Sequence, residues 1–352
     1  MLFGKKDHLI GLDIGSRIIK AGEVVETKKG WFLKRFGAVD IPPGCIEEGQ
    51  IKNKDEIAES IQQLFKSYNL RRHNVSISVG GYSVIVKRIS VQKMTEEQLS
   101  STIHFEAEQY IPFDISEVNI DFHIIGDSEH NPNQMNVLLV AAKKEMIQDY
   151  TEVVDMAGLT PCIIDVDAFA LQNIYELSSG GAEDEYVALI DIGASKTSLN
   201  IICGYLSVFI RDVSLGCDQI IKKIMSMTGC SFLEAEEIKN NTESDKITQE
   251  DMQMIVSSVV ADWCTEIRRA LDFFYSTYPD KNISKIILSG GGANVKEFRD
   301  NLSLQTSVDV TVINPFAKII IDNDHLDEEY LKQMAPQSAI CMGLAMRRVN
   351  DK

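Results

Sequence analysis

Two short stretches of this sequence have the same order of residues and could do the same chemistry. An apolar run near the start contains Asp13 and breaks at Gly15, and a second run, about half the chain later, contains Asp191 and breaks at Gly193. A glycine directly after a strand allows a tight turn whose N–H groups can bind phosphate oxygens. A carboxylate beside a phosphate would repel it unless a cation lies between them. The two aspartates therefore predict a divalent metal ion, with Mg²⁺ favoured.

The repetition of the pattern carries more weight than either copy. A single Asp-Ile-Gly sequence is also typical of an aspartate that ends a strand in a turn. Two copies in the same order at this spacing indicate two related lobes that face each other. We therefore expect a nucleoside polyphosphate between the lobes. Lys20 is either a further phosphate neighbour or a solvated lysine at the end of a strand.

A third stretch could contact the rest of such a ligand. Three consecutive glycines, Gly290 to Gly292, lie between an apolar strand and a well-patterned helix. They permit close approach of a flat or bulky group and use the helix N-terminus, whereas the alternative is a flexible turn. Glu236 and Lys239 are three residues apart on one helical face, which by itself predicts a surface ion pair.

The elements that position these residues begin with a sheet, helix and strand. Residues 8–42 predict three strands, residues 53–70 an amphipathic helix, and residues 74–81 a buried strand that ends in two glycines. The polar, glycine-rich segment at residues 180–185 predicts a linker before the second copy of the pattern.

Residues 84–160 predict a separate, small α/β unit inserted between these parts. Its first helix begins at Thr95, with Gln98 placed for a capping box, and ends at Pro112. Two strands and a second helix closed by Gly158 complete the unit.

Composition excludes several classes of function. The net charge of -17 argues against a general affinity for nucleic acid or for an anionic membrane surface. The seven cysteines are scattered, which predicts neither a disulfide framework nor a zinc site and favours a reducing cytoplasm. The apolar runs are too short to cross a bilayer, so direct membrane insertion is not expected.

These motifs resemble the two phosphate motifs and the adenosine motif of the actin-like ATPases. A narrower resemblance covers essentially the whole chain: "FEAEQYIPFDISEV", "LIDIGASKTSLNI", "VINPF" and "APQSAICMGLAMR" resemble the PilM family of type IV pilus assembly, which is similar to FtsA. The resemblance implies an α/β, actin-like (ASKHA) two-lobed fold with duplicated ribonuclease H-like cores and an inserted, SHS2-like 1C subdomain. The implied subdomains are 1A (residues 1–83, 161–182 and 336–352), 1C (84–160), 2A (183–217 and 281–335) and 2B (218–280).

The resemblance also assigns site residues for ATP and Mg²⁺ position by position. The first phosphate loop would contain Asp13, Gly15 and Ser16, with Lys20 nearby. The second loop would contain Asp191, Gly193, Ala194, Ser195 and Thr197. Adenosine would contact Gly290, Gly291, Gly292, Ala293, Glu236 and Lys239. Asp13 and Asp191 would hold Mg²⁺. Asp165 is the candidate that positions the attacking water, with Asp167 in reserve, although a cap for the following helix is an equal alternative.

The implied function is that of an ATP-binding assembly protein. Its partner would be the N-terminal cytoplasmic tail of a PilN-like membrane protein, which would place the chain in the cytoplasm at the inner face of the plasma membrane. Contacts with pilus assembly ATPases and self-association are left open. The expected residues of the partner groove, which alternatively form the core face of their helix, are Phe105, Tyr110, Ile111 and Phe113.

Two other functions fit the same superfamily less well. A filament-forming tether like FtsA would need a C-terminal amphipathic helix, which the sequence does not predict. A small-molecule kinase would need a catalytic base aimed at a substrate hydroxyl, and the sequence singles out none. ATP hydrolysis is expected to be slow or absent.

Overall fold

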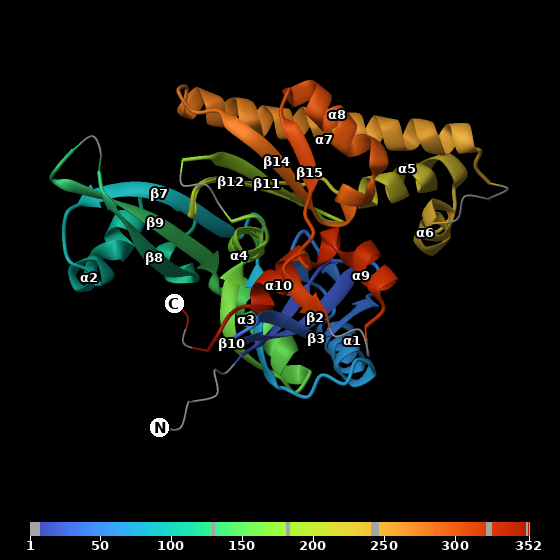
Figure 1. Cartoon of the computed structure of the whole chain (residues 1–352), viewed down its shortest axis with the longest axis horizontal. Helices are drawn as coiled ribbons and strands as arrows, with labels where there is room; N and C mark the ends of the chain where they lie inside the picture. Colours follow the sequence, from blue (N-terminus) through green and yellow to red (C-terminus); the bar gives the residue numbers. More distant parts are fainter. Residues whose placement is uncertain are drawn as a thin grey trace.

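The computed structural model describes residues 8–128, 131–180, 184–240, 246–321, 326–349 and 351. Two lobes lie one above the other, and a smaller module projects from their side (Figure 1). Among these residues no helix is both long enough and apolar enough to span a membrane.

The lower lobe in Figure 1 is built on a mixed sheet. Its strand order is β10-β6-β1-β2-β3-β16, in which β1, β2 and β3 are antiparallel and the remaining pairs are parallel. The strands are β1 (Ile10–Ile14), β2 (Ile18–Thr27), β3 (Gly30–Asp40), β6 (Asn74–Val79), β10 (Thr160–Val166) and β16 (Ile319–Ile321). A separate small hairpin consists of β4 (Ile46–Glu47) and β5 (Gln50–Ile51).

The upper lobe repeats this arrangement. Its strand order is β13-β12-β11-β14-β15, again with three antiparallel strands followed by parallel ones. The strands are β11 (Tyr186–Ile192), β12 (Thr197–Cys203), β13 (Leu206–Val213), β14 (Ile283–Ser289) and β15 (Asp309–Val312). The predicted α/β fold with duplicated cores is therefore confirmed.

Helices cover the outer faces of both sheets and fill the space between them. The lower outer core contains α1 (Lys54–Ser67) and α3 (Lys144–Met156), and the shared middle core contains α4 (Asp167–Ser179) and α10 (Ala339–Ala345). Strand β11 alternates between cores: Ile190 faces the upper core, whereas Leu189 faces the middle one. Strand β11 thus contributes one face to the core of the upper lobe and the other face to the core between the two lobes.

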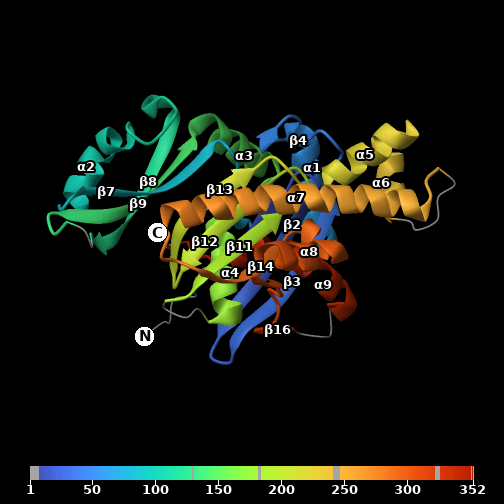
Figure 2. The ribbon, with the colours of Figure 1, turned by 90° about the horizontal axis from the view of Figure 1, so that it is seen from above.

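The upper lobe has its own outer layer of helices, crossed by the long helix α7 (Figure 2). Trp263 on α7 is fully buried and packs edge-on against Phe298 of α8. The helices of this layer are α5 (Asp218–Thr228), α6 (Phe232–Asn240), α7 (Gln249–Thr277) and α8 (Lys296–Thr306). The remaining short helices are η1 (Ile115–Glu117), η2 (Gly291–Asn294), η3 (Pro336–Ser338) and α9 (Glu328–Met334).

The inserted module has the predicted order of strand, helix and two strands. Its sheet has the order β7-β9-β8, and its elements are β7 (Val84–Gln92), α2 (Glu96–Ala107), β8 (Val118–Asp127) and β9 (Gln134–Lys143). The predicted capping box is confirmed, because Thr95 and Gln98 bond reciprocally. The helix ends at Ala107 and does not reach Pro112, since residues 108–110 form a turn.

Helix α3 follows the inserted sheet but packs elsewhere. Its buried residues Met146, Tyr150 and Val153 belong to the core of the lower lobe and not to the core of the module. The proposed subdomain boundaries remain a prediction, and these contacts favour a module that ends near Lys143. The predicted linker includes residues 181–183, which lie outside the described residues.

Candidate functional site

The two repeated aspartates lie at equivalent strand ends. Asp13 is on β1 opposite Lys20 of β2, and Asp191 is on β11 opposite Ser198 of β12. Each strand then turns at a glycine into its antiparallel neighbour. The two hairpins face each other across a cavity of about 990 Å³ between the lobes. The hydroxyl oxygens of Ser16 and Ser195, one from each hairpin turn, are 3.0 Å apart.

Most of the predicted site residues line this cavity. They come from both hairpins, from α6 and from the turn after β14. The predicted residues in the lining are Asp13, Gly15, Ser16, Lys20, Asp191, Gly193, Ala194, Ser195, Glu236, Lys239, Gly290 and Gly291.

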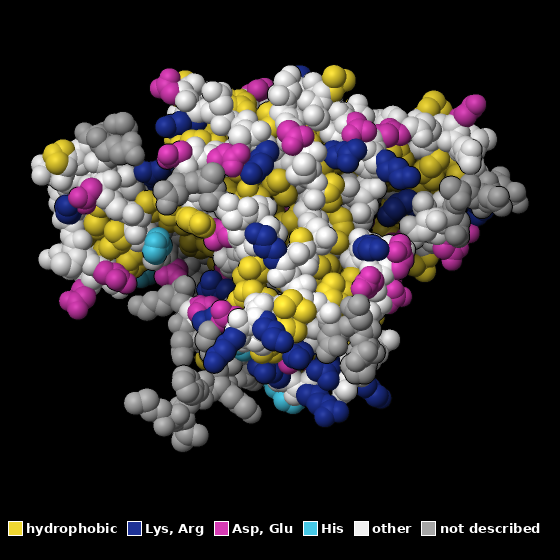
Figure 3. Space-filling model, in the orientation of Figure 1, with side chains coloured by type: hydrophobic (Ala, Val, Ile, Leu, Met, Phe, Trp, Pro, Cys, Tyr) yellow, Lys and Arg dark blue, Asp and Glu magenta, His cyan; other side chains and the backbone are white. Residues whose placement is uncertain are grey.

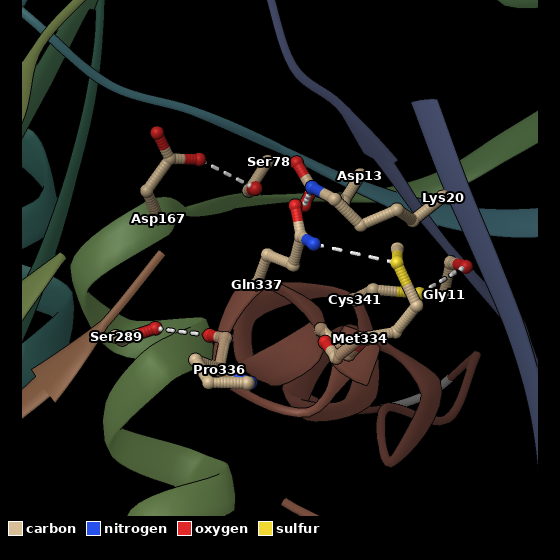
Figure 4. Close-up of polar contacts among 11 residues, drawn as sticks. Gly11, Asp13, Lys20, Ser78, Asp167, Ser289, Met334, Pro336, Gln337 and Cys341 are labelled. Carbon is tan, nitrogen blue, oxygen red and sulfur yellow. Dashed lines mark hydrogen bonds and ion pairs between the residues drawn. The ribbon is translucent and has the colours of Figure 1, made fainter. Parts of the chain in front are cut away.

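The turn after β14 requires glycine at its first position. Gly290 has a positive φ of 82°, and a Cβ atom there would lie 2.3 Å from the Ile192 carbonyl oxygen. Its N–H donates to the Pro336 carbonyl, and the Ser289 hydroxyl donates to the same oxygen (Figure 4). These bonds tie the turn to η3, from which Gln337 also reaches the cavity.

Three predicted contact residues do not line the cavity. Thr197 is buried and donates its hydroxyl to the Leu215 carbonyl at 3.0 Å, so it holds the hairpin to the following segment. A Cβ atom on Gly292 would lie 2.4 Å from the Ile192 side chain, so this glycine permits close packing inside the lobe. Ala293 is buried in the same core.

The two candidate water-positioning aspartates lie in different surroundings. Asp165 does not line the cavity: it is buried on β10, where Arg347 lies 3.5 Å away. Burial raises the pKa of Asp165. The chain turns into α4 after Val166, and the reserve candidate Asp167 is thereby brought to the cavity wall. The placement thus favours Asp167 over Asp165.

Asp167 is held at the wall by two hydrogen bonds. The Ser78 hydroxyl donates to Oδ1 at 2.6 Å, and the Lys196 ammonium donates to Oδ2 at 2.6 Å (Figure 4 shows the Ser78 contact). Burial would raise the pKa of this carboxyl, but Lys196 and Ser78 outweigh burial and lower it. Asp167 is therefore an ionised acceptor with both oxygens engaged.

The carboxylates of the two hairpins differ in their partners. Asp13 is buried and accepts from Lys20 Nζ at 2.6 Å. Burial opposes the charge of Lys20, yet Asp13 outweighs it and raises the pKa of the ammonium. Asp191 forms no ion pair with the described residues, and burial together with the nearby Asp13 raises its pKa to about 6. A cation beside Asp191 would therefore relieve an unfavourable charge.

The predicted ion pair on α6 is replaced by a longer-range contact. Glu236 does not pair with Lys239; both its oxygens accept from Arg17 Nη2 at 2.7 Å. The Arg17 guanidinium lies 4.4 Å from the centre of the Phe232 ring. Arg17 belongs to the first hairpin turn, so this contact joins the lower lobe to α6 across the cavity.

Sequence reasoning missed several lining residues. Lys196 stands inside the second phosphate motif but was assigned no role, and Arg17 follows directly on Ser16. Cys217 also lines the cavity, where burial raises the pKa of its thiol to about 12. Motif position was the signal for Lys196, whereas Arg17 becomes visible only once the lobes are placed together.

The four predicted groove residues divide between surface and core. Ile111 is 6% exposed and belongs to the module core, while Tyr110 and Phe113 pack against that core. Lys87 lies over the Tyr110 ring. Phe105 alone of the four is largely exposed, at 73%, on a module that presents hydrophobic side chains at the surface (Figure 3).

A family model described as type IV pilus assembly protein PilM matches residues 11–349. The chain belongs to this family. A solved PilM-PilN type IV pilus biogenesis complex matches with a TM-score of 0.86 and 28% identity, over 98% of this chain and 100% of that one.

More distant relatives agree on the fold. The chain is 25% identical over 259 residues to the cell division protein FtsA of Bacillus subtilis (strain 168), covering 65% of this chain and 57% of FtsA. The chain thus spans little more than half the length of that relative. MreB5 of Spiroplasma citri, solved bound to AMPPNP, matches with a TM-score of 0.51 and 12% identity over 96% of this chain and 94% of that one. At that identity the likeness shows the actin-like fold alone.

Proposed function

We propose that this protein is an ATP-binding assembly component of a type IV pilus or related secretion machine. It binds the N-terminal cytoplasmic tail of a PilN-like membrane protein, which holds it at the inner face of the plasma membrane. The observation that carries the proposal is the cavity between two equivalent hairpins, each of which contributes an aspartate and a glycine turn. Family membership and the likeness to a PilM-PilN complex support the partner.

The residues at the cavity fit a nucleoside triphosphate. Two glycine turns face each other at the hairpins, where backbone can approach phosphate oxygens. The Gly290 turn, Glu236 and Lys239 lie at the wall formed by the upper lobe, where they can contact ribose and base. A volume of about 990 Å³ is ample for a ligand of this size. MreB5, on the same fold, was solved with AMPPNP.

The donor set also fits Mg²⁺ better than a metal held by protein alone. Among the described residues no group of three or more His, Cys, Asp or Glu side chains could hold a metal ion. Mg²⁺ commonly binds through one or two carboxylates together with phosphate oxygens and water. Asp191 and Asp13 supply those carboxylates, and Asp191 is the stronger candidate because it has no cationic partner among the described residues. Bound Mg²⁺ would neutralise part of the phosphate charge.

The partner would bind beside the inserted module. Since Ile111, Tyr110 and Phe113 support the module core, Phe105 is the groove residue free to contact a peptide. An exposed aromatic side chain on a supported helix suits a peptide anchor. Asp167 at the cavity wall, held by two donors, is suited to orient water but is a weak base, which fits slow ATP hydrolysis.

The experiment is a fluorescence titration of the whole chain with a synthetic N-terminal tail of the PilN-like protein encoded beside it. Wild type should bind the tail, and Phe105→Ala should weaken binding by at least about tenfold, the usual effect of removing an aromatic anchor. Leu304→Ala, an exposed apolar residue on α8, is the matched control and should have no effect. Absence of tail binding with and without Mg-ATP would exclude the assembly function.

A further inference from the structure

A lysine and an aspartate from different lobes meet at one end of the cavity. Lys196 lies in the turn between β11 and β12 of the upper lobe, and Asp167 is the first residue of α4. Their side chains are 25% and 16% exposed, and Nζ lies 2.6 Å from Oδ2. Both line the cavity. The ion pair is thus only partly desolvated and open to a ligand.

The strand behind the pair holds its carboxylate in place. A Cβ atom on Gly80 would lie 2.3 Å from Lys196 Nζ and 2.5 Å from Asp167 Oδ2, so the glycine after β6 leaves room for the ion pair. Ser78 on the same strand donates to the other oxygen of Asp167. The carboxylate therefore stays in place, whereas the lysine stem can swing its ammonium toward another anion.

Strand order places the pair on the side of Asp191 opposite to the Gly290 turn. Strand β11 carries Asp191 and has β14 on one side and β12 on the other. The Gly290 turn follows β14, and Lys196 precedes β12, so they flank Asp191 on opposite sides. A nucleotide whose adenosine lies at Gly290 and whose phosphates cross the hairpin turns would point its last phosphate toward Lys196.

The cavity lining has few basic side chains that could offset the negative charge of a triphosphate. Among the described residues the lining holds four basic and seven acidic side chains. Lys20 is engaged by Asp13 and Arg17 by Glu236, both with short contacts. A triphosphate carries about four negative charges, and Mg²⁺ offsets two of them. Lys196 is also paired, with Asp167, but its side chain is 25% exposed against 9% for Lys20 and 14% for Arg17. Lys239 lies on α6, at the wall proposed for adenosine. The ammonium of Lys196 is therefore the cation best placed to meet the charge that distinguishes a triphosphate from a diphosphate.

We propose that Lys196 determines the specificity of this cavity for nucleoside triphosphates. When a triphosphate is bound, the Lys196 ammonium turns from Asp167 to the terminal phosphate. A diphosphate does not reach it, and the Lys196–Asp167 pair remains closed. This inference rests on the proposed nucleotide binding and adds the residue that distinguishes a triphosphate from a diphosphate.

The proposal predicts opposite effects for the two members of the pair. Lys196→Met removes the cation, so affinity for a triphosphate should fall by about ten- to a hundredfold, the range for one charge-assisted hydrogen bond. Asp167→Asn removes the competing anion but keeps the shape, so affinity for a triphosphate should rise. Affinity for ADP should change by less than about threefold in both variants.

The test is isothermal calorimetry of the whole chain with AMPPNP and with ADP, each with Mg²⁺. Lys285→Met is the control, since Lys285 is similarly exposed and pairs with Glu185 away from the cavity. An equal change for both nucleotides, or no change, would show that Lys196 only supports the fold and would overturn the proposal. If Lys196→Met does not fold, Asp167→Asn decides alone. Wild type that binds neither nucleotide would instead overturn the nucleotide-binding function itself.

Discussion

At the scale of single residues, the buried position of Asp191 disfavours the ionised form of its carboxyl. Its pKa is raised to about 6, chiefly by burial, from an ordinary value near 4. The folded chain therefore binds a proton more tightly than the unfolded chain. The contribution of Asp191 to the free energy of unfolding is therefore highest below about pH 4 and falls as pH rises toward 6, after which that contribution stays constant.

The corresponding prediction concerns Asp191→Asn without nucleotide or metal. The variant lacks the charge, so at pH 7 its free energy of unfolding should exceed that of wild type by about 1–2 kcal/mol. At pH 4 and below the difference should vanish. Urea unfolding at the two pH values measures both. A variant that is less stable than wild type at pH 7 would show that the Asp191 carboxylate is already neutralised by its neighbours.

Single residues were predictable from the sequence where a pattern was repeated. Asp13 and Asp191 were found because each is a copy of the other. Lys196 lies in the same motif as Asp191, but its proposed role depends on its ion pair with Asp167 of the other lobe. The spacing of residues along the sequence does not predict that pair. The order of Asp165 before Asp167 stays a prediction, and the placement favours Asp167, because the turn from β10 into α4 brings that carboxylate to the cavity wall.

At the scale of elements, α10 crosses its neighbours in backbone contact. A Cβ atom on Gly343 would lie 1.8 Å from the Ala170 carbonyl oxygen of α4, and one on Gly11 would lie 2.2 Å from the Cys341 carbonyl oxygen. Backbone atoms cannot move aside as a flexible side chain can. These two glycines therefore set the distance at which α4, α10 and β1 pack.

We predict that Gly343→Ala destabilises the protein by about 3 kcal/mol or more, because overpacking a core against backbone is costly. Gly291→Ala is the control, since its added methyl group would meet nothing closer than 3.9 Å. Thermal or urea unfolding compares the two. Equal stability of the two variants would mean that α10 can shift without loss.

Element boundaries were predicted well where local signals act. The start of α2 follows from the Thr95–Gln98 capping box, which local sequence specifies. Its end was predicted at Pro112, but the helix already ends at Ala107, because residues 108–110 form a turn. Helix α3 packs on the lower lobe through contacts with α1, and these contacts exist only in the assembled fold.

At the scale of the whole molecule, two copies of one fold enclose a cavity that neither could form alone. The middle core of α4 and α10 joins them, and side-chain contacts across the cavity link hairpin to hairpin and hairpin to α6. The half-length repeat predicted this symmetry. The inserted module is attached at Gly80 and Gly81, beside the Lys196–Asp167 pair. The proposed partner-binding module and the proposed phosphate-binding end of the cavity are therefore connected at this point.

The most direct measurement is a calorimetric titration of the whole chain with Mg-ATP, for wild type and for Asp191→Asn. Wild type should show one site per chain, with binding that needs Mg²⁺. Asp191→Asn should fold at least as well as wild type yet bind Mg-ATP at least about tenfold more weakly, because a metal ligand is lost. Equal affinity of the two proteins, or no binding by wild type, would contradict the claim that the paired hairpins clamp Mg-ATP.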